Sequence, residues 1–151
     1  MKILEILTPK RLIGNFGEYE AARLLRKSGY KILKRNYTAL DAEIDIIARK
    51  DNITAFIEVK TRNVKGLGYK EARPASSVTP EKQRKIIKAA KYYISHNPAD
   101  TRLRLDVIEV YLEDSLRLKV KEIKHIENAF DLNSAYDKKY QYIRHKERSN
   151  L

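Results

Sequence analysis

The sequence contains no cysteine and only three histidines, which stand far apart along the chain: His96, His125 and His145. The absence of cysteine excludes disulfides, thiolate zinc sites and cysteine nucleophiles, and it is typical of a protein that works in a reducing cytoplasm. The scattered histidines form no metal-binding motif. Any bound metal ion must therefore be held by oxygen ligands.

Long apolar segments are also missing. The N-terminal run Ile3 to Leu7 is short and is interrupted by Glu5, so it predicts neither a signal peptide nor a membrane span. Two glycine-containing segments, G-N-F-G-E at 14–18 and G-L-G-Y-K at 66–70, lack the spacing and the strand-to-helix context of nucleotide-binding loops. The sequence therefore predicts a cytoplasmic protein without membrane contact, and it gives no indication of ATP use.

Positive charge is what the chain has in excess. It holds 32 lysines and arginines against 20 acidic residues, which gives a formal net charge of +12 and a pI near 9.8. This excess favours a polyanionic partner, and nucleic acid, most of all DNA, is the leading candidate. Nothing in the pattern decides the oligomeric state, so a homodimer is left open.

A length of 151 residues suits one domain with a hydrophobic core. We expect that domain to cover residues 1–130 and a basic C-terminal tail or helix to cover 131–151. Strands are predicted at 30–37, at 103–111 and at 116–120. One helix precedes the first of these strands, and a hairpin and a second helix lie between the first and the second. This order predicts an α/β fold in which a mixed sheet is flanked by helices in three layers.

The hairpin is predicted from the turn signal Asp51-Asn52, which two β-rich runs flank. A two-residue loop sets Ile46 opposite Ile57. One face of the hairpin is then apolar throughout. Its members are Ile44, Ile46, Ala48, Ala55, Ile57 and Val59.

The other face of the hairpin carries charge at one end. The same register sets Asp45 opposite Glu58 and Glu43 opposite Lys60. Carboxylates in a semi-buried corner repel one another and lose hydration, so the cluster favours a bound cation such as Mg²⁺ or Mn²⁺. The alternative is an interstrand salt-bridge patch, because Glu43 and Lys60 also form an ordinary cross-strand pair.

The first predicted helix extends from Thr8-Pro9, or at the latest from Asn15, to Ser28. Glu18 lies at the edge of its apolar stripe. If Asn15 is the N-cap, Glu18 has the spacing of a capping box, and this explanation competes with a role in catalysis.

The second predicted helix begins at Thr79-Pro80 and extends to about Ser95. A long loop over residues 62–78 precedes it. A lysine-rich helix surface ordinarily means a solvated face, but in so basic a domain it is also a candidate for phosphate contacts. The predicted nucleic-acid contacts of the loop and the helix are Arg62, Lys65, Lys70, Arg73, Lys82, Arg84 and Lys85.

Six motifs are distributed from Gly14 to Phe130: G-N-F-G-E at 14–18, K-R-N-Y at 34–37, E-I-D-I-I-A at 43–48, F-I-E-V-K-T-R at 56–62, K-x-R-x-I-x-x-A-A from Lys82, and N-A-F at 128–130. In these motifs the chain resembles the YraN family. That family is similar to archaeal Holliday junction resolvases and is placed in the restriction-endonuclease-like, PD-(D/E)xK class of nucleases. The resemblance implies that fold.

The resemblance also implies roles for particular residues. The class uses a glutamate on a helix, an aspartate at the start of a hairpin and an E-x-K motif, and these positions fall on Glu18, Asp45, Glu58 and Lys60. The two hairpin acids would bind the ion, the helix glutamate and the carbonyl of Val59 would be further ligands, and the lysine would orient the attacking water. Accessory candidates are Glu43 and Gln83.

The sequence departs from the family at Ala42, where relatives commonly have glycine, and in the basic segment after Phe130. The expected function is that of a Mg²⁺-dependent endonuclease acting on DNA, branched or otherwise structured DNA included. Two alternatives are left open. One is a nucleic-acid-binding module that keeps the nuclease scaffold, and the other is an RNA-associated protein whose acidic cluster is a salt-bridge network.

Overall fold

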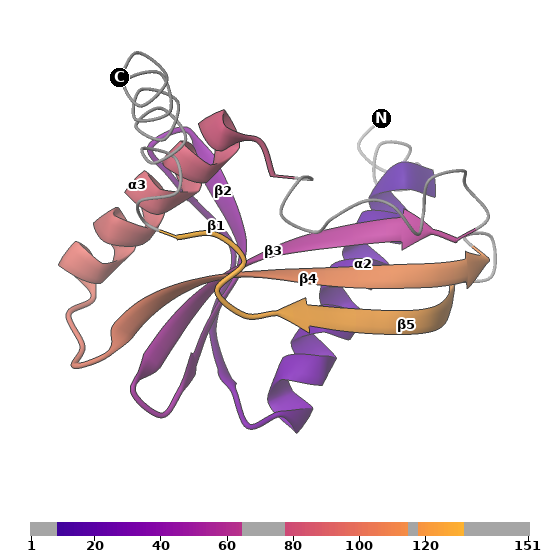
Figure 1. Cartoon of the computed structure of the whole chain (residues 1–151), viewed down its shortest axis with the longest axis horizontal. Helices are drawn as coiled ribbons and strands as arrows, with labels where there is room; N and C mark the ends of the chain where they lie inside the picture. The colour runs from indigo at the N-terminus through magenta and orange to yellow at the C-terminus, as the bar shows by residue number, and fades with distance from the viewer. Residues whose placement is uncertain (1–8, 65–77, 115–117, 132–151) are drawn as a thin grey trace, which may run out of the picture.

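The computed structural model describes residues 9–64, 78–114 and 118–131 (Figure 1). Most of the predicted loop and of the predicted tail, including Lys65, Lys70 and Arg73, lies outside these residues. In chain order, the elements are helix α2 (Pro9–Lys27), strands β1 (Lys31–Ala39), β2 (Ala42–Lys50) and β3 (Ile53–Asn63), helix α3 (Pro80–His96), and strands β4 (Arg102–Asp114) and β5 (Lys119–Ile126).

The five strands form one mixed sheet in the order β1-β2-β3-β4-β5. Strands β3 and β4 are parallel, whereas the other neighbouring pairs are antiparallel. Two parallel neighbours need a long crossover, and the segment that contains α3 provides it. The predicted α/β class with a mixed sheet is therefore confirmed.

Helices α2 and α3 cover opposite faces of the sheet. Leu25 of α2 shares a core with Ile46 of β2, whereas Ile87 of α3 shares a second core with Ile47. Consecutive strand residues point to opposite faces, so neighbours in the sequence belong to different cores. The result is a helix, sheet, helix arrangement in three layers.

The predicted hairpin register is confirmed where β2 and β3 pair. Ile46 lies opposite Ile57, Ala48 lies opposite Ala55, and Asp51 adopts the positive φ of 52° that a tight turn requires. This ladder ends at Ile46. Beyond it β2 stays paired with β1 and β3 stays paired with β4, so the sheet divides into two arms, which we call the fork (Figure 1).

One consequence of the fork contradicts the predicted hairpin face. Ile44 was expected to share the face of Ile46, but it packs in the core beneath α3, together with Ile47. The β2–β3 ladder does not extend to this residue, so the twist of the β1–β2 arm sets the direction of its side chain.

The N-terminus of α3 is as predicted. Thr79 is the N-cap, its side chain accepts a hydrogen bond from the backbone N–H of Lys82, and Pro80 is the first helical residue. Helix α2 already begins at Pro9, which places Asn15 inside the helix, so the capping-box explanation of Glu18 is wrong. Of the two helices in the described part of the chain, neither has the length and hydropathy needed to cross a membrane.

The extent predicted for the last strand is wrong. Strand β5 covers Lys119–Ile126 instead of 116–120. Its register shifts beside Leu112, and Val120 and Ile123 pack on the same core although they are three positions apart. A bulge of this kind breaks the period-two alternation by which strands are recognised.

Candidate functional site

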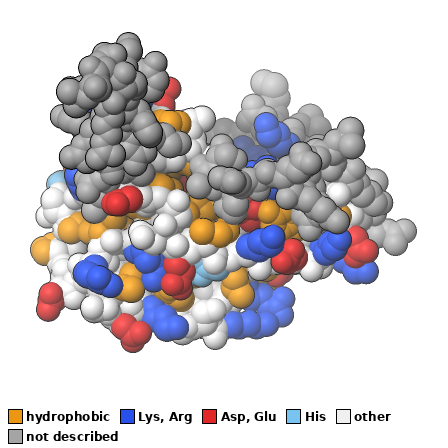
Figure 2. Space-filling model, viewed as in Figure 1, with side chains coloured by type: hydrophobic (Ala, Val, Ile, Leu, Met, Phe, Trp, Pro, Cys, Tyr) orange, Lys and Arg blue, Asp and Glu red, His pale blue; other side chains and the backbone are white. Residues whose placement is uncertain are grey.

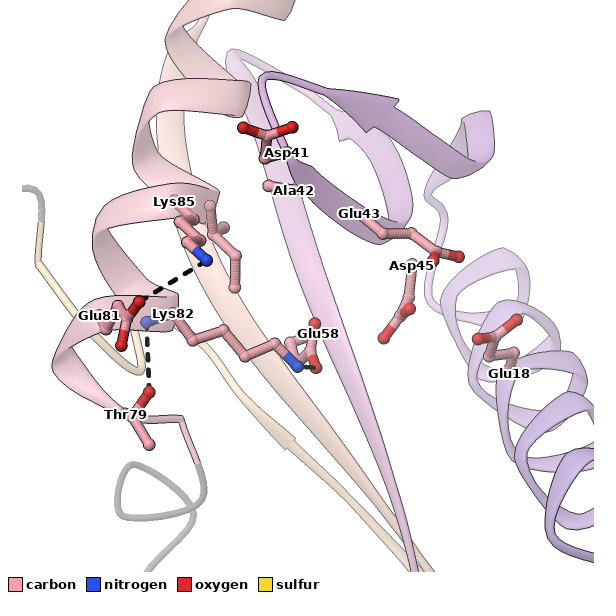
Figure 3. Close-up of a pocket in the computed structure, with 11 residues that line it drawn as sticks. Glu18, Asp41, Ala42, Glu43, Asp45, Glu58, Thr79, Glu81, Lys82 and Lys85 are labelled. Carbon is pink, nitrogen blue, oxygen red and sulfur yellow. Dashed lines mark hydrogen bonds and ion pairs between the residues drawn. The ribbon is translucent and has the colours of Figure 1, made fainter.

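A cavity of about 560 Å³ lies at the fork. Residues from α2, from the β1–β2 turn, from β2, from β3 and from the start of α3 line it (Figure 3). The lining residues are Glu18, Asp41, Ala42, Glu43, Asp45, Glu58, Thr79, Glu81, Lys82, Lys85 and Ile86. Three of the four predicted catalytic residues, Glu18, Asp45 and Glu58, thus line one cavity. The fourth, Lys60, contacts Glu58.

The position of Glu18 depends on a close approach of α2 to β3. A Cβ atom at Gly17 would collide with the side-chain oxygen of Thr61, so this approach requires glycine. The next residue, Glu18, points toward the cavity with its side chain 19% exposed (Figure 3). This contact gives the second glycine of the G-N-F-G-E motif a physical role.

Two residues of β1 contact the carboxylate of Glu18. The guanidinium of Arg35 lies 4.0 Å away. With its amide nitrogen facing the acids, Asn36 donates to Glu18 at 3.1 Å and to Glu43 at 3.3 Å. Burial raises the pKa of Glu18, and Glu43 adds to this rise while Arg35 opposes it.

Asp45 projects into the cavity from β2, just beyond the last ladder pair. Its Oδ2 atom accepts a hydrogen bond of 2.7 Å from the backbone N–H of Val59. Burial, followed by the negative charge of Glu58, raises the pKa of Asp45 to about 8, although the hydrogen bond from Val59 opposes the rise. The Asp45 carboxyl group is therefore harder to ionise than a solvated aspartate until a cation compensates its charge.

The N–H and C=O groups of one strand residue point to the same edge. The carbonyl of Val59 therefore faces the edge of β3 on which Asp45 lies. This direction fits the predicted use of that carbonyl as a metal ligand.

Glu58 is buried, with 6% of its side chain exposed, and two ammonium groups contact it. Lys60, two residues along β3, lies 3.3 Å from Oε1. Lys82 reaches the same oxygen from α3 (Figure 3). Both ammonium groups therefore contact the same carboxylate oxygen.

The remaining predicted residues are dispersed. Glu43 is exposed at the rim of the cavity, and Lys60, expected opposite it, contacts Glu58. Gln83 is buried and donates to the carbonyl of Val78 at 2.9 Å, so it supports the start of α3 and does not line the cavity.

The predicted nucleic-acid contacts within the described residues fall into three environments. Arg84 and Lys85 are exposed on α3, Lys82 contacts Glu58, and Nε of Arg62 lies 4.0 Å from Oε2 of the buried Glu109. On the face drawn in Figure 2, lysine and arginine side chains are mixed with acidic ones.

Sequence reasoning missed the contacts of Arg35 and Asn36 with the acids. Asn36 has a φ of +50°, a conformation that asparagine tolerates better than most residues. A K-R-N-Y motif ahead of the acidic hairpin was the available signal.

The chemistry of the donor set fits a hard divalent cation. The carboxylates of Glu18, Asp45 and Glu58 and the carbonyl of Val59 supply oxygen ligands only. Burial and neighbouring acids raise the pKa of Asp45 and burial raises that of Glu18, so a bound cation would offset the cost of ionising these carboxyl groups. Among the described residues, no three acidic or histidine side chains are already assembled as a metal cage, so binding would have to draw the ligands together.

Fold and site together define an α/β protein with an acidic, oxygen-only site in the fork of a mixed sheet. The chain matches the uncharacterised protein family UPF0102 over residues 17–110, and it belongs to that family. UPF0102 is the YraN family, so the resemblance stated from the motifs is confirmed. The matched range contains Glu18, Asp45, Glu58 and Lys82.

Curated relatives span most of the chain. A UPF0102 protein of Chloroherpeton thalassium is 44% identical over 122 residues, which cover 78% of this chain and 92% of the relative. A UPF0102 protein of Clostridioides difficile is 45% identical over 118 residues, or 78% and 95% of the two chains. One of Caldicellulosiruptor saccharolyticus is 40% identical over 122 residues, or 80% and 98%. The names of these relatives state no activity.

Proposed function

We propose that this protein is a metal-dependent endonuclease of the restriction-endonuclease-like class that hydrolyses phosphodiester bonds in DNA, with branched or otherwise structured DNA among its substrates. The observation that carries the proposal is the convergence of Glu18, Asp45 and Glu58 at one cavity. The sheet divides at this point, and the opening gives a phosphate backbone room to approach.

Each residue of the site would have its own role in binding the ion or in catalysis. Asp45 and Glu58 would hold Mg²⁺ or Mn²⁺, with the carbonyl of Val59 and the carboxylate of Glu18 completing the ligand set. The bound ion would lower the pKa of a coordinated water and neutralise charge on the phosphate. Lys60, whose ammonium lies 3.3 Å from Glu58, would orient the attacking water and stabilise the negative charge that develops on the phosphate.

Basic side chains next to the cavity support binding of a polyanion. Arg84 and Lys85 are exposed on the same helix that lines the cavity, and the whole chain carries a net charge of +12. If several such residues each neutralise one phosphate, DNA affinity should fall by about three orders of magnitude between low and moderate ionic strength. A salt titration monitored by fluorescence anisotropy measures this dependence, and binding that does not respond to salt would contradict it.

Cleavage is tested with purified protein, Mg²⁺ or Mn²⁺, and linear, nicked, flapped and four-way DNA of matched sequence. Asp45→Asn and Lys60→Ala should each lower the rate by roughly two to three orders of magnitude. Asp41→Asn is the matched control, because Asp41 also lines the cavity but has no assigned role. Its rate should stay close to that of the wild type.

One observation favours a second candidate, a nucleic-acid-binding module without catalysis. Two lysines already neutralise Glu58, which is what a structural salt-bridge network would provide. A wild-type protein that binds DNA in a salt-dependent way, yet cleaves none of the four substrates with either metal, would replace the enzyme by this module. The same binding assay with RNA decides between the two nucleic acids.

A further inference from the structure

Lys82 lies in the first turn of α3, and its side chain crosses the cavity to the sheet (Figure 3). Its ammonium contacts Oε1 of Glu58, the oxygen that Lys60 also approaches. The charge of Lys82 also acts on Asp45. A cation supplied by the helix layer thus contacts one of the two acids that are proposed to bind the metal and acts electrostatically on the other.

One buried carboxylate needs one nearby cation, and Lys60 already supplies it from the same strand. The second ammonium therefore compensates the charge of the acidic cluster as a whole. A divalent ion coordinated by Glu58 and Asp45 would be repelled by an ammonium left at this position. Metal ion and Lys82 must therefore compete for Glu58.

Lys82 and Lys60 differ in how easily their ammonium groups can move away from Glu58. The side chain of Lys82 is 42% exposed, whereas that of Lys60 is 28% exposed. The flexible four-carbon stem of a lysine can rotate into solvent. The Thr79 cap fixes the backbone of the first turn of α3, so this rotation leaves the helix in place.

We infer that Lys82 is a tethered counter-ion, which occupies the cation position beside Glu58 in the metal-free protein, leaves when the divalent ion binds, and then binds a phosphate of the nucleic acid. This inference rests on the proposed metal-dependent function and adds a regulatory step to it. A phosphate that receives the released ammonium favours metal binding, so the metal ion and the nucleic acid bind cooperatively.

The decisive experiment measures Mn²⁺ affinity without nucleic acid, by titration calorimetry, for the wild type and for Lys82→Met. Methionine keeps an unbranched stem but removes the competing charge. Close charge pairs couple strongly enough that we expect Lys82→Met to bind Mn²⁺ at least about tenfold more tightly than the wild type. Circular dichroism checks the fold, and Lys82→Gln is the second variant if Lys82→Met does not fold.

Lys85→Met is the matched control. Lys85 lines the same cavity but pairs with Glu81 at 3.7 Å, so this variant loses the same charge without freeing Glu58. Its Mn²⁺ affinity should change by less than about threefold, because exposed pairs are weak and are screened by salt. Lys82→Arg, which keeps a cation, should bind Mn²⁺ as the wild type does.

A DNA duplex of fixed length should raise the Mn²⁺ affinity of the wild type and leave that of Lys82→Met unchanged. Equal or weaker Mn²⁺ binding by Lys82→Met would overturn the role of Lys82 and leave the metal site standing. Binding by Lys82→Met but not by the wild type would support the inference. If neither protein binds Mn²⁺ at millimolar concentration, the inference and the proposed metal-dependent function both fall.

Discussion

Asp106 of β4 and Asp45 of β2 lie in one sheet, but their surroundings shift the pKa values of the two carboxyl groups in opposite directions. Asp106 is fully buried. It accepts two hydrogen bonds of 2.8 Å from Arg104, one of 2.8 Å from Nε2 of His125 and one of 3.0 Å from the backbone N–H of Asn128. Burial alone would raise its pKa, but the hydrogen bonds outweigh burial and lower it.

Asp45 receives a single backbone hydrogen bond, from Val59. Burial, followed by the negative charges of Glu58 and Glu18, raises its pKa to about 8. Lys82 opposes this rise but does not cancel it. The two aspartates therefore differ in how many donors they have, and Asp106 is fully buried whereas Asp45 is partly buried.

The comparison separates a structural carboxylate from a candidate ligand. Asp106 connects β4 to β5 and to the segment after it, through His125 and Asn128, and it leaves no charge for an outside ion. Asp45 faces a cavity with its charge undercompensated, which is the arrangement that perturbed functional groups share. We therefore expect Asp106 to contribute to stability and Asp45 to contribute to metal binding.

The largest effect should come from Asp106→Ala. Removing the carboxylate leaves the guanidinium of Arg104 partly buried and without its bidentate partner, so we expect a loss of about 3–5 kcal/mol in the free energy of unfolding. Urea denaturation of the metal-free protein measures it. Glu127→Gln is the control, because Glu127 pairs with Arg104 at 3.6 Å but is 58% exposed, and it should cost less than about 1 kcal/mol. Similar costs for the two variants would show that the Asp106 network is no more stabilising than a surface pair.

Glu58→Gln should have an intermediate effect. A neutral amide cannot balance the ammonium groups of Lys60 and Lys82, and the site is buried, so we expect a loss of about 1–3 kcal/mol in the metal-free protein. The melting temperature in the presence of a chelator measures this change. A rise would mean that Glu58 is as undercompensated as Asp45 and that the two ion pairs contribute nothing.

The sequence allowed the hairpin to be predicted because both of its faces carried information. An apolar face fixed the register of Ile46 with Ile57, since a slip of one residue would expose the whole apolar set. The charged face then placed Asp45 and Glu58 at the same end. Both helices could be recognised for similar local reasons, among them the Thr79 cap.

The fork could not be predicted, because the end of the β2–β3 ladder depends on tertiary packing and not on a local pattern. Ile44 was consequently assigned to the wrong face. Lys82 was assigned to phosphate binding, since nothing near it in the sequence shows that its side chain reaches Glu58. His125 looked isolated, and its hydrogen bond to Asp106 exists only because β5 pairs with β4.

The smallest predicted change in stability, and the one with the opposite sign, is that of Asp45→Asn. The pKa of Asp45 is about 8 in the folded protein and near 3.9 when unfolded, so between these values the folded state binds more protons. Stability that is present below about pH 4 is therefore lost as the pH rises toward 8. Asparagine avoids this loss. Because Asp45 is only partly buried and borders the cavity, solvent screening reduces the effect of the shift, and by pH 8 the metal-free variant should exceed the wild type by about 1.4 kcal/mol, the equivalent of one pKa unit.

Melting curves at pH 4, 6 and 8, with a chelator and with Mg²⁺, test this prediction. The advantage of Asp45→Asn should be absent at pH 4 and grow with pH, because only in the wild type does unfolding release a proton from residue 45 in this range. Saturating Mg²⁺ should reverse the order at pH 8, since the ion stabilises the protein that binds it by about 2.7 kcal/mol at one hundred times its dissociation constant. An advantage that does not depend on pH, or that Mg²⁺ leaves unchanged, would mean that Asp45 is a structural carboxylate like Asp106. The contrast between the two aspartates would then carry no functional meaning.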